Sequence, residues 1–117
     1  MINSYTHEFK RASIGLLLSI IHNVNSKSSS KYYKFFQKEL NINPDEFEEI
    51  LELKEFKKSH NITVENDIDI ILKELNYKRH QIMKFLMILN RCIIIDGCDI
   101  KSYQQFEKIR DSFIKKI

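Results

Sequence analysis

The pattern of apolar and polar positions along the chain predicts helices almost throughout. The most apolar stretch is residues 82–95, in which the following side chains recur at helical spacing: Ile82, Phe85, Leu86, Leu89 and Ile93. Methionine and isoleucine occupy most positions between them, and the run is interrupted only by Lys84, Asn90 and Arg91. A helix that is apolar on nearly all sides either crosses a membrane or lies at the centre of a helical core. Because the run is shorter than the roughly 18 residues that a bilayer needs and carries two cations, we expect a core helix.

Two helices are expected before residue 43. The first should span residues 6–24, with Thr6 as its N-cap and with these inward positions: Phe9, Ser13, Leu16, Leu17, Ile20 and Val24. Residues 25–30 are rich in serine, which competes for backbone hydrogen bonds, so they are expected to form a linker. The second helix should bury Tyr32, Tyr33, Phe36 and Leu40.

The third and fourth helices have clear start signals. Asn43 is an expected N-cap, Pro44 suits the first helical position, and Glu46 stands at the capping-box position. The inward residues of this helix should be Phe47, Ile50 and Leu51. After a loop at 57–61, Thr63 should cap a helix that ends at Asn76 and buries Val64, Ile68, Ile71, Leu72 and Leu75.

The core helix should begin near Tyr77 and stop at Gly97, since glycine adopts the left-handed conformation that ends many helices. Asp99 can cap a last helix whose inward positions are Tyr103, Phe106, Ile109, Phe113 and Ile117. Residues 14–40 also align with residues 84–110 when shifted by 70, each segment giving an apolar helix, a polar turn and an aromatic-led helix. We therefore expect an all-α fold over residues 1–117: a single domain of about six helices, with two similar helical hairpins around a central apolar helix at about 78–95.

Composition supports the helical prediction and reveals an uneven charge. The 117 residues include 2 Gly and 1 Pro, with 43% apolar and 30% charged residues, which is ordinary for a globular domain. Residues 44–74 hold ten acids against four lysines, and the segments on either side carry excess positive charge. These charges either pair on folding or form a face for a protein partner. The expected partner-binding residues are Glu48, Glu49, Glu52 and Glu55.

Cysteine and histidine give no catalytic or zinc pattern. The two cysteines, Cys92 and Cys98, are separated by five residues, which is not a zinc-knuckle spacing even if His22 and His80 are considered with them. Cys92 lies inside the apolar run and is expected to act as a small buried hydrophobe. With no phosphate loop, hydrolase triad or signal peptide visible, we expect a cytoplasmic protein that is not an enzyme.

The segment from Leu86 to Gly97, an apolar helix closed by Asp96-Gly97 and followed by a polar turn and an aromatic-led helix, resembles the TerB-like (tellurite-resistance) family. The link 40–47 is also similar to that family's step from its first hairpin to the next helix. The resemblance implies an all-helical domain with an acidic cluster, one Asp and one Glu in each of two turns, associated with divalent cations. It also implies a stress- or defence-related setting.

This chain departs from the family pattern at the cluster. The first turn reads Asn25-Ser26-Lys27, without a carboxylate, and the glutamate position of the second turn falls near Gln104. What survives is Asp96 and Asp99, so no cofactor is expected beyond weak Ca²⁺ or Mg²⁺ binding at a degraded site. The alternative is that Asp96 stabilises a turn and Asp99 caps the last helix.

Three functions remain open at this point. The leading expectation is a non-enzymatic domain that acts by association with a protein or a membrane surface. The second is a small immunity or inhibitor protein that presents its acidic region to one partner. The third is a nucleic-acid binder that uses the basic and aromatic side chains of residues 31–38 and 101–116. The net charge of the chain, +3, is however below that of strong phosphate binders. The oligomeric state is not determined by the sequence.

Overall fold

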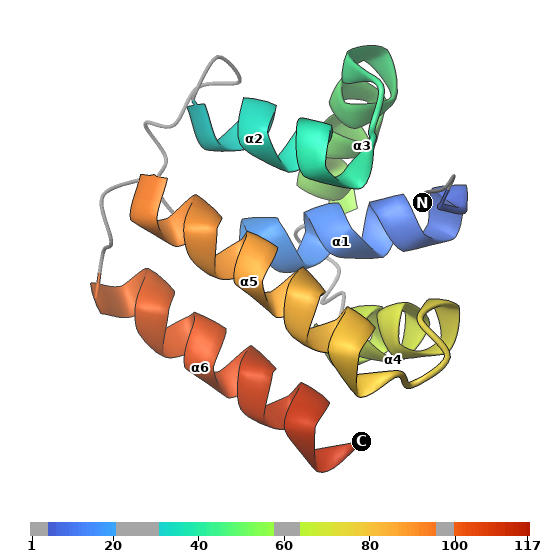
Figure 1. The fold of residues 1–117 in the computed structure, drawn as a ribbon. Coiled ribbons are helices and arrows are strands. Elements are labelled where there is room, and N and C mark those ends of the chain that lie inside the picture. The colour runs from blue at the N-terminus through green and yellow to red at the C-terminus, as the bar shows by residue number, and fades with distance from the viewer. Residues whose placement is uncertain (1–4, 21–30, 58–63, 96–99) are drawn as a thin grey trace.

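The computed structural model describes residues 5–20, 31–57, 64–95 and 100–117, apart from the side chains of residues 32, 51 and 53–57. These residues form six α-helices and no strand, which confirms the all-α prediction (Figure 1). The helices are α1 (His7–Ile20), α2 (Lys31–Leu40), α3 (Pro44–Lys57), α4 (Val64–Glu74), α5 (Arg79–Ile95) and α6 (Ile100–Lys115).

Helix α1 lies at the centre of this arrangement. It packs against α3, α4 and α6, and it reaches α5 through an edge-to-face contact between Phe9 and Phe85, whose ring centroids are 5.9 Å apart. The side chains of Leu16, Leu17 and Ile20 are completely buried. Ser13 is buried as well, and its hydroxyl donates to the Phe9 carbonyl at 2.8 Å, so this polar group is satisfied inside its own helix.

Helix α5 occupies the predicted place in the chain, but the prediction that it is enclosed on nearly all sides is wrong. Its inner face is buried, through Ile82, Phe85, Leu86, Leu89, Cys92 and Ile93. On its outer face Met87 is 68% exposed and Ile94 is 55% exposed. The reason is its position: α5 crosses in front of α1 in Figure 1, with α2 on one side and α6 on the other, so one face has no covering helix. No described helix is long and apolar enough to cross a membrane.

The predicted helix starts at Thr6 and Asn43 are confirmed. Thr6 Oγ1 accepts a hydrogen bond from the Phe9 amide at 3.1 Å, and Asn43 Oδ1 accepts one from the Asp45 amide at 2.8 Å. Each side chain thus satisfies an amide in the first turn that has no partner within the helix. Local hydrogen bonds therefore define the starts of both α1 and α3, as the sequence predicted.

Two helices end on residues in the left-handed conformation. Asn41 has φ 53° after α2, and Asn76 and Tyr77 have φ 55° and 57° after α4. In both cases an amide reaches back five residues, from Ile42 to the Gln37 carbonyl and from Tyr77 to the Leu72 carbonyl, at 2.9 Å. Asn76 was predicted to end α4. The left-handed conformation of Tyr77 was not predicted. Because of it, α5 begins at Arg79, two residues later in the chain than Tyr77.

Most predicted inward positions whose side chains are described are buried; Val64 and Ile117 are half-buried, and one residue of α6 is exposed. Phe106, Ile109 and Phe113 are buried there, whereas Tyr103 is 39% exposed. Because α6 lies at the edge of the bundle, it presents a wider face to solvent than its aromatic spacing indicated (Figure 1). Predictions for Val24, the linker 25–30, Thr63, Gly97 and the Asp99 cap fall outside the described residues.

The arrangement of two equivalent hairpins remains a prediction. Helices α5 and α6 pack against each other as expected for a hairpin. Helix α2, however, packs chiefly against α5, and α1 packs chiefly against α4. Residues 14–40 and 84–110 thus have similar sequence patterns, but the helices they contain do not have equivalent main packing partners.

The substitution Leu89→Asp should unfold the domain. Leu89 is fully buried on the inner face of α5, and an unpaired charge there costs several kcal/mol against a total stability of about 5–15 kcal/mol. Circular dichroism during thermal unfolding would measure the loss of the cooperative transition. The control is Met87→Asp, which places the same charge on the exposed face of the same helix and should leave the transition nearly unchanged. Cooperative unfolding of Leu89→Asp at the wild-type temperature would contradict the packing described here.

Candidate functional site

The acids of residues 44–74 do not form a single face. They are divided between α3 and α4, which lie on opposite sides of α1 in Figure 1. The sequence suggested one acidic region that either pairs with the basic flanks or faces a partner. In the structure the acids of α4 mostly contact other parts of the fold, whereas most described acids of α3 are exposed.

The acids of α4 mostly hold neighbouring elements. Lys116 Nζ lies 2.8 Å from Glu65 Oε1 and 2.9 Å from Asp69 Oδ1, which ties the end of the chain to α4. The hydrogen bond from Lys116 lowers the pKa of Glu65 from its ordinary value of 4.5, and the hydrogen bond to Asp69 raises the pKa of Lys116. Glu74 accepts hydrogen bonds from Thr6, including one from Oγ1 at 3.1 Å. These carboxylates are therefore engaged within the fold.

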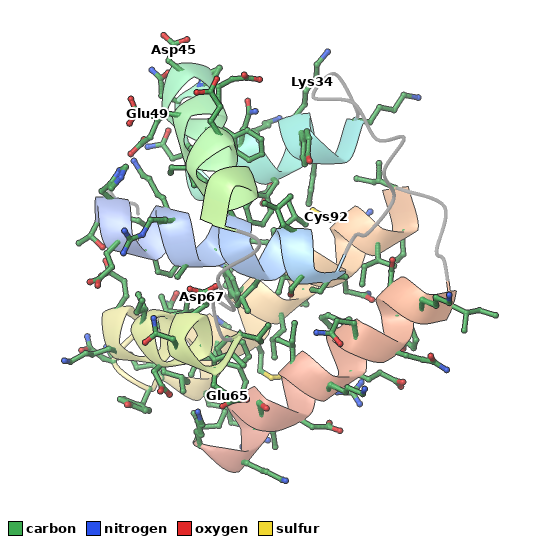
Figure 2. The ribbon with its side chains drawn as sticks, turned by 180° about the vertical axis from the view of Figure 1, so that it is seen from behind. Lys34, Asp45, Glu49, Glu65, Asp67 and Cys92 are labelled. Carbon is green, nitrogen blue, oxygen red and sulfur yellow. The ribbon has the colours of Figure 1, made fainter. Side chains whose placement is uncertain are left out.

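Asp67 belongs to the interior rather than to a solvated acidic face. It is 5% exposed, and Figure 2 places it between α4 and α1. Asp67 is one of the ten acids of residues 44–74, and its burial excludes it from a face for a partner. The spacing contained the signal, because Asp67 lies three residues after Val64 and four before Ile71, on the stripe that α4 buries.

Glu46 anchors α3 to α1. Its carboxylate lies 2.9 Å from His7 Nδ1 and 3.1 Å from Lys10 Nζ. The hydrogen bond to His7, with a further one from Lys10, lowers the pKa of Glu46 below its ordinary value of 4.5. The capping-box role predicted for Glu46 is thus wrong, because both carboxylate oxygens are directed to α1 instead of to the start of α3.

Four of the remaining acids of α3, those whose side chains are described, form a row on its outer side, which we name the acidic face: Asp45, Glu48, Glu49 and Glu52. All four side chains are exposed, and their spacing of three and four residues places them on one side of the helix. Figure 2 shows Asp45 and Glu49 directed away from the rest of the molecule. None of the four forms an ion pair with a described residue. Three of the four predicted partner-binding residues therefore lie on this face, and the side chain of the fourth, Glu55, is outside the described part.

The predicted metal residues Asp96 and Asp99 lie outside the described residues, so weak Ca²⁺ or Mg²⁺ binding there remains a prediction. Within the described ranges, no three or more His, Cys, Asp or Glu side chains are grouped to hold a metal ion. A hollow between α2 and the start of α3 is lined by polar and basic side chains, among them Lys10, Lys34 and Lys38.

Cys92 is reduced and buried, as predicted from its apolar surroundings. Burial raises the pKa of its thiol to about 12, so the nucleophilic thiolate is scarce at neutral pH. His80 is exposed at the start of α5, about 18 Å along the helix from Cys92. These two residues therefore do not form a catalytic pair. His22 and Cys98, the other members of the zinc set considered above, are outside the described residues.

Comparisons of the chain with protein-family models, curated proteins and solved structures find no match. The resemblance to the TerB-like family therefore remains a prediction that rests on Asp96-Gly97 and its flanking helices. The described structure adds two observations: α3 carries the acidic face, and this face is separate from the paired acids of α4.

Glu46→Gln should lower stability by about 0.5–1 kcal/mol near neutral pH, because it removes an ion pair that is only partly shielded from solvent. Since the folded-state pKa of Glu46 is depressed, its contribution is fully present above 4.5 and is lost as the pH falls through the lower, folded-state value. Chemical denaturation at several pH values would show the wild type and the variant converging in acid. Glu48→Gln is the control, because it removes an exposed carboxylate that forms no ion pair with a described residue and should change stability little. A difference that persists unchanged at low pH would contradict the assignment.

Cys92 should not react with a thiol reagent in the folded protein. In a Cys98→Ser background at pH 8, only about one Cys92 in ten thousand carries the thiolate, and that sulfur is buried. Ellman's reagent should therefore modify Cys92 only after denaturant is added, at the rate of global unfolding. Rapid modification of the native chain would show that the inner face of α5 is open to solvent.

Proposed function

We propose that this chain is a non-enzymatic helical domain that binds a protein partner through the acidic face of α3. The observation that carries the proposal is the gathering of Asp45, Glu48, Glu49 and Glu52 on one exposed side of a helix, without ion pairs to described residues. The neighbouring carboxylate of Glu46 is engaged with α1, so it holds this helix in place while the others face outward. The partner that fits this face is a protein with a basic surface.

The energetics of α3 support this proposal. Asp45 and Glu49 are four residues apart, as are Glu48 and Glu52, and like charges at this spacing destabilise a helix by roughly 0.2–0.5 kcal/mol per pair. Only the acids of the first turn gain from the helix dipole. The outer acids of α3 thus weaken the isolated helix, whereas a basic partner would turn their repulsion into attraction.

The setting of this proposal comes from the sequence alone. The cytoplasmic location is an expectation from the sequence, and a stress- or defence-related pathway is what the TerB-like resemblance implies. A small immunity or inhibitor protein would use the same acidic face towards a single partner. The two alternatives differ in the identity of that partner rather than in the surface involved.

Neutralising two members of the acidic face should weaken partner binding. The immobilised chain would be incubated with an extract of its source cell, and bound proteins would be quantified by mass spectrometry. We expect Glu48→Gln/Glu52→Gln to reduce the amount of bound partner about tenfold. Each exposed charge at a protein–protein interface contributes on the order of 1 kcal/mol to binding. Raising the salt concentration should weaken the wild-type interaction in the same direction.

Glu8→Gln/Glu39→Gln is the matched control, since it removes two exposed carboxylates from α1 and α2 and leaves the acidic face intact. It should retain the partner at the wild-type level. A partner that binds the Glu48→Gln/Glu52→Gln protein as well as it binds the wild type would contradict the proposal.

A further inference from the structure

The exposed large apolar side chains of the described residues are confined to one part of the molecule. They are Tyr77, Met83, Met87, Ile94, Ile100, Tyr103 and Ile114. All seven belong to α5, to the turn that precedes it, or to α6. Helices α1 to α4 contribute none among the side chains that the structure describes. Single exposed apolar residues are normal on a protein surface, but their restriction to two neighbouring helices marks an interaction surface.

Three of these side chains share one side of α5, and a fourth lies at the adjoining end of α6. Met83, Met87 and Ile94 are spaced by four and seven residues, so they form a stripe on the outer side of α5. Helices α5 and α6 pack against each other and run side by side in opposite directions in Figure 1. Because only four residues join them, Ile94 near the end of α5 and Ile100 at the start of α6 lie at the same end of the pair. Ile100 is the most exposed of the set, at 73%.

The same two helices carry excess positive charge. Together they contain seven lysines and arginines against two acids, and α5 has no acid at all. Lys84 and Arg91 are exposed on α5, three residues before and four residues after Met87, so both border the apolar stripe. Lys101 is exposed beside Ile100. Exposed apolar side chains bordered by cations are typical of helices that lie in the interface of an anionic membrane.

We propose that the outer face of α5 and α6 docks on the surface of an anionic lipid bilayer. Met87, Ile94 and Ile100 would enter the boundary between headgroups and acyl chains, while Lys84, Arg91 and Lys101 contact lipid phosphates. The domain lies on the bilayer and does not cross it, in agreement with the absence of a membrane-spanning helix among the described residues. This face is separate from the acidic face of α3, so the inference does not depend on the proposed protein partner.

Charge and chemistry favour lipid over the other occupants of such a face. A symmetric contact with a second copy would place two positively charged faces against each other. A head-to-tail contact with the acidic face of another copy would satisfy the charges, but the described side chains of that face include no exposed large apolar one. Nucleic acid would pair with the cations, yet the methionine and isoleucine side chains gain little from phosphates or from base stacking. An anionic bilayer satisfies both the cations and the apolar stripe.

The test measures partitioning of the full chain onto lipid vesicles by flotation. We expect binding to vesicles of phosphatidylcholine mixed with phosphatidylserine, weaker binding as salt rises, and little binding to phosphatidylcholine alone. Met87→Ser/Ile94→Ser should reduce partitioning about tenfold or more by removing buried apolar area. Met87→Leu/Ile94→Leu should restore it. Because Met87 and Ile94 are exposed in the folded chain, circular dichroism should show that all these variants remain folded.

The charge variants form a matched pair. Lys84→Gln should lower partitioning about fivefold, which corresponds to one charge near an anionic surface. Lys73→Gln removes the same charge from the exposed surface of α4 and should leave partitioning nearly unchanged.

Four outcomes would overturn the proposal. The first is no binding to the phosphatidylserine vesicles, and the second is equal binding by the Met87→Ser/Ile94→Ser protein. The third is binding to a DNA or RNA oligonucleotide that outcompetes the vesicles and depends on Lys84 but not on Met87 and Ile94, which would assign the face to nucleic acid. The fourth is a lipid-independent dimer, seen by sedimentation, that Met87→Ser/Ile94→Ser dissociates, which would assign the face to a second copy. Loss of the acidic-face partner with vesicle binding intact would affect only the proposed function.

Discussion

From Phe9 to Ile20 every residue of α1 is buried or half-buried, and this burial determines how the other helices are placed. The ring of Phe9 in α1 contacts the ring of Phe85 in α5. The ring centroids of Phe85 and of Phe113 in α6 are 6.1 Å apart, so one aromatic cluster joins three helices. Such contacts combine a large buried area with a preferred tilted geometry, which fixes the helices in orientation as well as in distance. Because α1 fills the centre, α5 and α6 become covering helices with one face each towards solvent (Figure 1). The exposed apolar stripe on α5 is a direct consequence.

Ion pairs between the helices then decide which charges remain available at the surface. Lys116 engages two acids of α4, and Glu46 of α3 is engaged by His7 and Lys10 of α1. Exposed pairs of this kind contribute little to stability, but they neutralise the acids they contact. The outer row of α3 stays negative and the outer side of α5 and α6 stays positive. The molecule thus presents two surfaces of opposite charge, and the large apolar side chains that are exposed among the described residues all lie on or beside the positive one.

Local signals in the sequence predicted the helices well because they act over a few residues. Thr6 and Asn43 cap their helices, and Asn76 ends α4, each through hydrogen bonds within one turn. The exposed acids Glu48, Glu49 and Glu52 were also predicted correctly as surface residues, since nothing in their spacing matched an inward stripe. Tyr103 was misplaced, because its exposure depends on which helix lies opposite it. The burial of Asp67 was missed although its spacing places it on the stripe that α4 buries. Glu46 was assigned a local role, whereas its partners are 39 and 36 residues away in the chain.

By itself, the sequence determined the helical class, the order of the helices and the start or end of several of them, because capping, helical spacing and the scarcity of glycine and proline are local properties. Only the tertiary structure decided which helix is central. Both α1 and α5 carry enough apolar residues for that place, and α5 carries more of them on its outer positions. Burial depends on how many neighbours surround a helix, and hydrophobicity along the chain does not contain that number. The apolar side chains that made residues 82–95 look like the core are therefore partly the ones that the fold leaves at the surface.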